Sequence, residues 1–285
     1  WLPILYGPVL TFRPKKSAHA YAAIWNEAKG DSPLRVITQE QAEAVAAQVK
    51  SDHIIVEWAM RYGNPSMVDK MEALKTKGCE RILVFALYPQ YSATTTASVY
   101  DKAFDVLQEQ RWQQAIRTMP SYHDHPAYID ALSRSVNEHL ATLSWEPDVV
   151  LASFHGLPKR NLELGDPYYC QCQKTGRLLR EKLGWDEDKL RITFQSRFGR
   201  AEWLKPYTET TVKGLAAQGK KRIAVICPGF SADCLETLEE IAIGIKATFL
   251  EAGGEAFHYI PCLNSDEDHI AMLTALIKNE LQGWI

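Results

Sequence analysis

Residues 222–249 read RIAVICPGFSADCLETLEEIAIGIKATF, and this stretch decides the fold class. It begins with a short apolar run, Arg222–Cys227, whose length is typical of a buried strand. A Pro-Gly turn follows, and beyond it apolar side chains recur at helical spacing. That helical face carries Leu235, Leu238, Ala242, Ile245 and Phe249. A strand that turns directly into a helix is the repeating unit of a parallel α/β sheet.

The same alternation of strand and helix patterns extends over most of the chain. Further strands are predicted at residues 53–60, 81–87, 148–154, 191–194 and 256–260. Further helices are predicted at residues 66–77, 95–109, 125–141, 167–183 and 206–218. We therefore predict an α/β fold of two lobes, each an open parallel sheet flanked by helices, with a cleft between the lobes.

The domain organisation is read from one break in this alternation. Periodicity fails between residues 110 and 125, and we place the crossover between the lobes there. The predicted lobes are residues 1–115 and 116–265. A last helix, at about residues 266–285, is expected to pack back on the first lobe.

Composition and charge exclude several classes of protein. The 285 residues are 46% hydrophobic and 24% charged, as in an ordinary globular chain. The net charge is −3 and no Lys/Arg run is present, which argues against a nucleic-acid partner. No apolar stretch reaches the roughly 20 residues of a membrane span. The six cysteines form no paired CxxC motifs, which predicts a protein of the reducing cytoplasm.

Sequence motifs narrow the possible chemistry further. The sequence has no GxGxxG, GxxxxGK[ST], GxSxG or HExxH motif, so dinucleotide oxidoreductases, P-loop NTPases, serine hydrolases and zincins lose support. Cys170 and Cys172 form a CxC pair without the compact set of four thiolates that an iron–sulfur cluster needs. The other cysteines lie near apolar strands and fit core positions.

A histidine follows one of the predicted strands. Ligands of open parallel sheets bind beyond the carboxyl ends of the strands, and His155 comes directly after the run at 148–154. An imidazole at that position could accept a proton at neutral pH. The same residue could also serve only to bond the backbone at the strand end.

Acidic side chains mark the start of the helix after Pro228. Asp233 and Glu236 have the spacing of a capping box, which would explain both without a function. Glu236 and Glu240 lie one turn apart, so their carboxylates share one edge of the helix. Two carboxylates suit Mg²⁺ or Ca²⁺, and an added imidazole admits Fe²⁺, Zn²⁺ or Co²⁺.

Aromatic residues flank the predicted strand exits. They are Tyr62, Tyr88, Tyr91, Phe198 and Trp203. Each could be an ordinary core residue. Several at one rim would also suit a flat, conjugated ligand.

Four motifs together resemble one known family. They are LYPQYS at 87–92, SFHGLP at 153–158, TFQSRFG at 193–199, and CPGF at 227–230 continuing into DCLETLEE at 233–240. In this order they resemble the ferrochelatases, and the shorter bacterial enzymes most closely. The resemblance implies two Rossmann-type lobes around a cleft. It also implies a lyase that inserts Fe²⁺ into protoporphyrin IX, releases two protons and gives protohaem, the terminal step of haem biosynthesis. The Asn-Leu-Gly-x-Pro loop of the family has no counterpart in these residues.

The resemblance also assigns roles to individual residues. His155 matches the family's active-site histidine, to which either pyrrole proton abstraction or metal binding is attributed. Glu236 matches the carboxylate across the cleft, and Glu240 the next acid on the metal path. Asp233 matches a neighbouring acid that polarises the site. The implied substrate-binding residues are Arg13, Arg61, Tyr62, Tyr91 and Trp203, with Arg13 facing the porphyrin propionates.

Cofactor, partner and location are expectations of the same kind. Fe²⁺ is expected as a substrate, with no resident cofactor and no [2Fe–2S] cluster. The protein is expected in the cytoplasm as a monomer or homodimer, with peripheral contact to the inner face of the membrane through residues 1–12. Two alternatives stay open: a chelatase for coproporphyrin or sirohydrochlorin, and a carrier of haem or porphyrin without catalytic activity.

Overall fold

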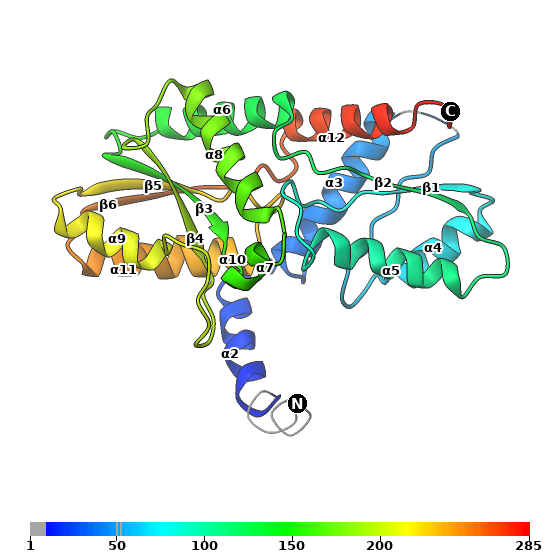
Figure 1. The fold of residues 1–285 in the computed structure, drawn as a ribbon, viewed down its shortest axis with the longest axis horizontal. Coiled ribbons are helices and arrows are strands. Elements are labelled where there is room, and N and C mark those ends of the chain that lie inside the picture. Colours follow the sequence, from blue (N-terminus) through cyan, green and yellow to red (C-terminus); the bar gives the residue numbers. More distant parts are fainter. Residues whose placement is uncertain (1–9, 50, 52) are drawn as a thin grey trace.

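The computed structural model describes residues 10–49, 51 and 53–285 of the chain. Two parallel β-sheets lie side by side and are flanked by helices (Figure 1). The larger sheet has four strands in the order β4-β3-β5-β6, and the smaller one pairs β1 with β2. These sheets confirm the predicted parallel α/β architecture.

The larger sheet contains strands that the sequence predicts to within one residue or two. They are β3 (Val149–His155), β4 (Leu190–Gln195), β5 (Arg222–Ile226) and β6 (Ala256–Ile260). The helices on its two faces are α6 (Pro126–Ala141) and α8 (Tyr168–Leu183) on one, and α9 (Thr208–Ala217) and α11 (Lys246–Glu251) on the other (Figure 1). A short helix, α7 (Lys159–Glu163), follows β3.

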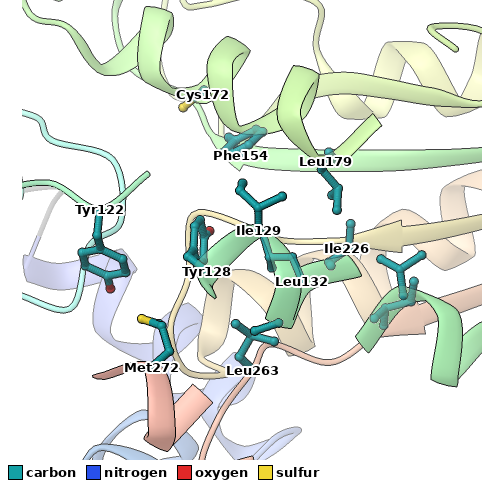
Figure 2. Packing of buried hydrophobic residues seen from close by; sticks show 14 of the residues in the cluster. Tyr122, Tyr128, Ile129, Leu132, Phe154, Cys172, Leu179, Ile226, Leu263 and Met272 are labelled. Carbon is teal, nitrogen blue, oxygen red and sulfur yellow. The ribbon is translucent and has the colours of Figure 1, made fainter. Parts of the chain in front are cut away.

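The apolar side chains of β3 divide between two cores. Val150, Ala152 and Phe154 belong to the core under α6 and α8, which Figure 2 shows from close by. Val149 and Leu151 belong to the core under α9 and α11. Because successive side chains of a strand point to opposite faces, a strand covered on both faces must be apolar throughout. The buried run at 149–154, which is apolar apart from Ser153, therefore indicates a central strand.

The smaller sheet departs from prediction in two places. β1 (Arg81–Val84) lies where a strand is expected, but its partner β2 (Ala115–Thr118) falls inside the stretch 110–125 that was predicted to be a crossover. The strand predicted at 53–60 is wrong, since in the described part of that segment only Met60 makes a bridge, to Ser66. A strand needs a hydrogen-bonded neighbour, and β1 pairs only with β2 in its sheet. The lobe boundary between 115 and 116 stays a prediction.

Six helices complete the described fold. They are α2 (Leu10–Ala22), α3 (Pro33–Val49), α4 (Met67–Thr76), α5 (Thr96–Gln108), α10 (Leu235–Thr237) and α12 (Glu267–Glu280). Helix α12 packs against α3 and α6, while α2 extends away from the body of the molecule (Figure 1). Within the described residues, no helix is both long and apolar enough to cross a membrane.

The helix predicted from 235 to 249 is continuous in space but not regular. Between α10 and α11, residues Leu238–Ile245 form a π-helix, η2. A π-helix widens the turn and rotates the following side chains, and it is frequent at functional sites. Glu240 lies within this segment, so its orientation differs from that expected of a regular α-helix.

Candidate active site

A cavity of about 660 Å³ opens where strands of both sheets end. His155 and Glu236 line it from the larger sheet, and Arg61 and Tyr88 line it from segments beside the smaller one. Most of the other lining residues are apolar, including Leu34, Val45, Val56, Trp58, Phe230 and Leu273. The structure thus brings three of the predicted site residues to one apolar hollow: His155, Glu236 and Arg61.

His155 is the last residue of β3 and is half-buried. Its Nδ1 lies 2.6 Å from the carbonyl oxygen of Gly156, so the Nδ1–H donates to that oxygen. The neutral ring then keeps its lone pair on Nε2. The rings of Trp203 and Phe230 lie 6.4 Å and 6.5 Å from the imidazole, centroid to centroid. The arrangement gives a fixed tautomer with a free proton-accepting nitrogen among aromatic rings.

Gly156 is required where it stands by a close approach of the backbone. A Cβ at this position would lie 2.6 Å from the carbonyl oxygen of Gln195, on the paired strand β4. The Gly156 N–H donates to that same oxygen at 2.8 Å. The glycine therefore lets the chain leave β3 tightly and fixes where His155 is held.

Glu236 and Glu240 occupy different environments although they lie one turn apart. Glu236 is half-buried in α10 and lines the cavity, and its backbone oxygen accepts a hydrogen bond of 2.6 Å from Nε2 of Gln195. Glu240 lies outside the cavity lining, where its two oxygens accept from the N–H and the hydroxyl of Ser196, both at 2.6 Å. Burial raises the pKa of Glu240, and the bonds from Ser196 and the nearby His155 oppose that rise.

Asp233 is buried and fully engaged in hydrogen bonds. Its carboxylate accepts from the Thr237 hydroxyl at 2.9 Å, from the Tyr259 hydroxyl, and from Nδ2 of Asn264 at 2.7 Å. The predicted capping box of Asp233 with Glu236 is wrong. The N-cap of α10 is Cys234, whose N–H donates to the Thr237 hydroxyl at 2.9 Å.

The predicted metal ligands do not form a ready-made metal centre. Across residues 10–49, 51 and 53–285, no three His, Cys, Asp or Glu side chains are grouped so that they could hold a metal ion. The separation arises because Glu240 turns to Ser196 while Glu236 lines the cavity. Any part of His155, Glu236 and Glu240 in handling a metal stays a prediction.

The predicted substrate-binding residues differ in how close they lie to the cavity. Nε of Arg61 donates to Ser98, and its guanidinium stacks over the Tyr62 ring at 4.5 Å, although Tyr62 itself is 76% exposed. Trp203 lies beside His155. Tyr91 is half-buried outside the cavity lining, where its N–H donates to Gln171. The side chain of Arg13 lies outside the described part of the structure.

Two aromatic residues line the cavity beside the predicted catalytic residues. Tyr88 lines the cavity, and burial raises the pKa of its hydroxyl, with a further rise from the nearby Glu236. Phe230 lines it beside His155. Tyr88 is one of the aromatic residues that flank the predicted strand exits. Phe230 lies four residues beyond the end of β5, where the rule that ligands bind at strand exits could have selected it.

Comparison with known proteins identifies the family. The family model for ferrochelatases matches residues 1–281. A ferrochelatase of Rhizobium meliloti is 59% identical over 100% of this chain and 84% of its own length. One of Rhizobium etli is 57% identical over 100% of this chain and 83% of its own length.

Solved structures support the fold alone. SirB from Bacillus subtilis with Fe³⁺ superposes with a TM-score of 0.58 at 15% identity, covering 87% of this chain and 91% of that one. CbiX, described as the terminal enzyme of sirohaem biosynthesis in denitrifying bacteria, superposes with a TM-score of 0.57 at 14% identity, covering 86% of this chain and 91% of that one.

Because the family model spans nearly all of the sequence, the chain belongs to the ferrochelatase family.

Proposed function

We propose that this ferrochelatase, a lyase, inserts Fe²⁺ into protoporphyrin IX within the cavity and that His155 takes up the pyrrole protons. The observation that supports this role is the tautomer of His155, whose Nδ1–H is committed to the Gly156 carbonyl. The lone pair on Nε2 is then the one that can accept a proton. Metal cannot enter the ring while two N–H groups occupy its centre, so a base is needed.

The cavity suits a flat ligand with few negative charges. Its lining is mainly apolar and aromatic. The lysine and arginine side chains among the described lining residues are Arg61 and Lys70, and Lys70 pairs with Glu57 at 2.7 Å. A mainly apolar lining with few positive charges supports protoporphyrin, with two propionates, over tetrapyrroles that carry four or eight carboxylates.

The acids on α10 and η2 would then act on the metal and the released protons. Glu236 lines the cavity and would exchange water for carboxylate on Fe²⁺, the substrate ion. Glu240, held by Ser196 with a raised pKa, would accept protons that leave the site. Arg61, in the cavity lining, would hold the macrocycle. Tyr62, Tyr91 and Trp203 lie outside that lining, and their part in binding the macrocycle, like that of Arg13 toward the propionates, rests on the family resemblance.

Location and assembly stay proposals. Peripheral membrane contact through residues 1–12 falls largely outside the described residues, which begin at residue 10. We keep the cytoplasm, with contact at the inner face of the membrane, as the proposed location. We keep a monomer or a homodimer as the proposed assembly.

The variant His155→Ala tests the proposed role. Metal insertion should be lost while protoporphyrin binding stays within about tenfold of the parent, because the change removes a base and little of the apolar wall. Anaerobic Fe²⁺ insertion followed by absorbance measures the rate, and quenching of protoporphyrin fluorescence measures binding. His53→Ala, at an exposed histidine, is the matched control. Insertion by His155→Ala at the parent rate would contradict the role.

A further inference from the structure

Asn264 connects the loop after β6 to the loop that carries the acidic residues. Its Oδ1 accepts from the Asp233 N–H at 2.8 Å, and its Nδ2 donates to the Asp233 carboxylate at 2.7 Å. Its backbone is in the left-handed region, with φ of 44°. Asparagine is among the few residues other than glycine that accept this conformation readily. The backbone geometry and the paired hydrogen bonds therefore select the same residue type.

Asp233 transmits this contact to the helix that carries Glu236. The carboxylate oxygen not bound to Asn264 accepts from the hydroxyls of Thr237 and Tyr259. Thr237 follows Glu236 directly in α10. Asp233 is only 5% exposed, so its hydrogen bonds operate with little competition from water. The Asp233–Asn264 pair is thus joined by hydrogen bonds to the residue that follows Glu236.

The same asparagine is fixed from two other helices. Its backbone oxygen accepts from Nε2 of Gln41, on α3, at 2.9 Å and from Nδ1 of His269, on α12, at 2.6 Å. Gln41 also donates to the carbonyl oxygen of Ser231, in the loop before α10, at 2.9 Å. Burial lowers the pKa of His269 to about 4, so the ring is neutral at physiological pH. Asn264 therefore joins α3 and α12 to the loop before α10.

We infer that Asn264 is a positioning residue for metal insertion, acting through Asp233 to hold the turn that presents Glu236 to the cavity. The inference rests on the proposed function, because it takes Glu236 to act on the metal. In this inference Asp233 holds the turn through its hydrogen bonds, whereas the family resemblance implies that its charge polarises the site. The hydrogen-bond pattern, rather than the position of the negative charge, is then what the reaction requires.

An exchange of the two side chains separates these roles. Asn264→Asp places two carboxylates against each other, and Asp233→Asn leaves one acceptor oxygen where two carboxylate oxygens accepted from Asn264, Thr237 and Tyr259, so each single change costs at least one of these hydrogen bonds. The double variant Asp233→Asn with Asn264→Asp restores every donor and acceptor and moves the charge to residue 264. Each single variant should lower kcat by about tenfold or more, with KM for protoporphyrin within about threefold of the parent. The double variant should recover kcat to within about threefold of the parent.

Controls distinguish the outcomes. Asn279→Asp makes the same chemical change at an exposed position of α12 and should leave kcat unchanged. If Asn264→Asp does not fold, Asn264→Gly removes both bonds without strain at positive φ and should show the same loss of kcat. Single variants with parent kcat would overturn the inference, as would a folded double variant as slow as the slower single one. A parent protein that inserts no metal would instead refute the proposed function.

Discussion

At the scale of single residues, Glu240 carries a carboxylate that is costly to ionise in the folded protein. Burial raises its pKa above the ordinary value of 4.5, so its contribution to stability is full below that value and is lost as the pH rises through the folded pKa. The variant Glu240→Gln removes this ionisation and keeps an acceptor for Ser196. The melting temperature of the parent should therefore fall, relative to that of the variant, as the pH rises above 4.5. Thermal unfolding of both proteins over this rise in pH checks the sign, and parallel curves would contradict it.

Glu236 and Glu240 should also differ in their effect on activity. Glu236 lines the cavity, whereas Glu240 is turned to Ser196. The variant Glu236→Gln should lower the insertion rate by about a hundredfold or more, and Glu240→Gln by about tenfold or less. Initial rates of Zn²⁺ insertion into protoporphyrin would rank the two acids. The reverse order would mean that the metal path begins at Ser196.

At the scale of elements, the close contact between α8 and β4 requires a glycine, Gly176, on α8. A Cβ on Gly176 would lie 2.3 Å from Cδ1 of Ile192, so alanine forces that side chain to move. The variant Gly176→Ala should lower the free energy of unfolding by about 1–3 kcal/mol, and adding Ile192→Val should recover part of it. Gly214→Ala, on α9, is the control because nothing lies within 4 Å of the added Cβ. Urea unfolding should show this control to be as stable as the parent or more stable.

The elements differ in how far the sequence reveals them. The apolar residues of strands β3 and β5 are 0–1% exposed, because both faces of these strands are covered. Such burial requires a nearly continuous apolar run, which can be recognised in the sequence. Strand β2 is four residues long and only partly buried, which left no such run. The strand predicted at 53–60 has the right composition without a hydrogen-bonded partner. The π-helix is invisible to the apolar spacing because that spacing continues through it.

The candidate site also contains residues that local sequence reveals and contacts that it does not reveal. His155 and Glu236 follow from local sequence, because they lie at or beyond strands that the structure contains, whereas Arg61 was assigned through the family resemblance alone. The pairing of Glu240 with Ser196 joins residues 44 apart, and that of Asp233 with Asn264 joins residues 31 apart. Such contacts depend on sheet order and loop path, which periodicity does not encode. The roles that these contacts favour could therefore be proposed only with the structure.

At the scale of the whole molecule, α12 stabilises a helix that lies far from it in sequence. Helix α12 packs against α3, and Leu273, only 2% exposed, also lines the cavity. The variant Leu273→Ala should cost about 2–5 kcal/mol of stability and loosen α3 as well as α12. Hydrogen exchange followed by mass spectrometry should show faster exchange in peptides from residues 33–49. Lys278→Ala, at an exposed site on α12, is the control, and loosening confined to α12 would contradict the coupling.

The packing of α12 on α3 also sets an order of events during synthesis. Helix α3 ends at Val49 and α12 begins at Glu267, so the facing ends of the two contacting elements lie 218 positions apart in the sequence (267 − 49). At roughly 5–20 residues per second, the ribosome needs about 11–44 seconds to deliver the second after the first. Throughout that interval Val45 and Val49 have no α12 to cover them. The apolar face of α3 therefore stays without its α12 neighbour until residues 267–280 have been synthesised.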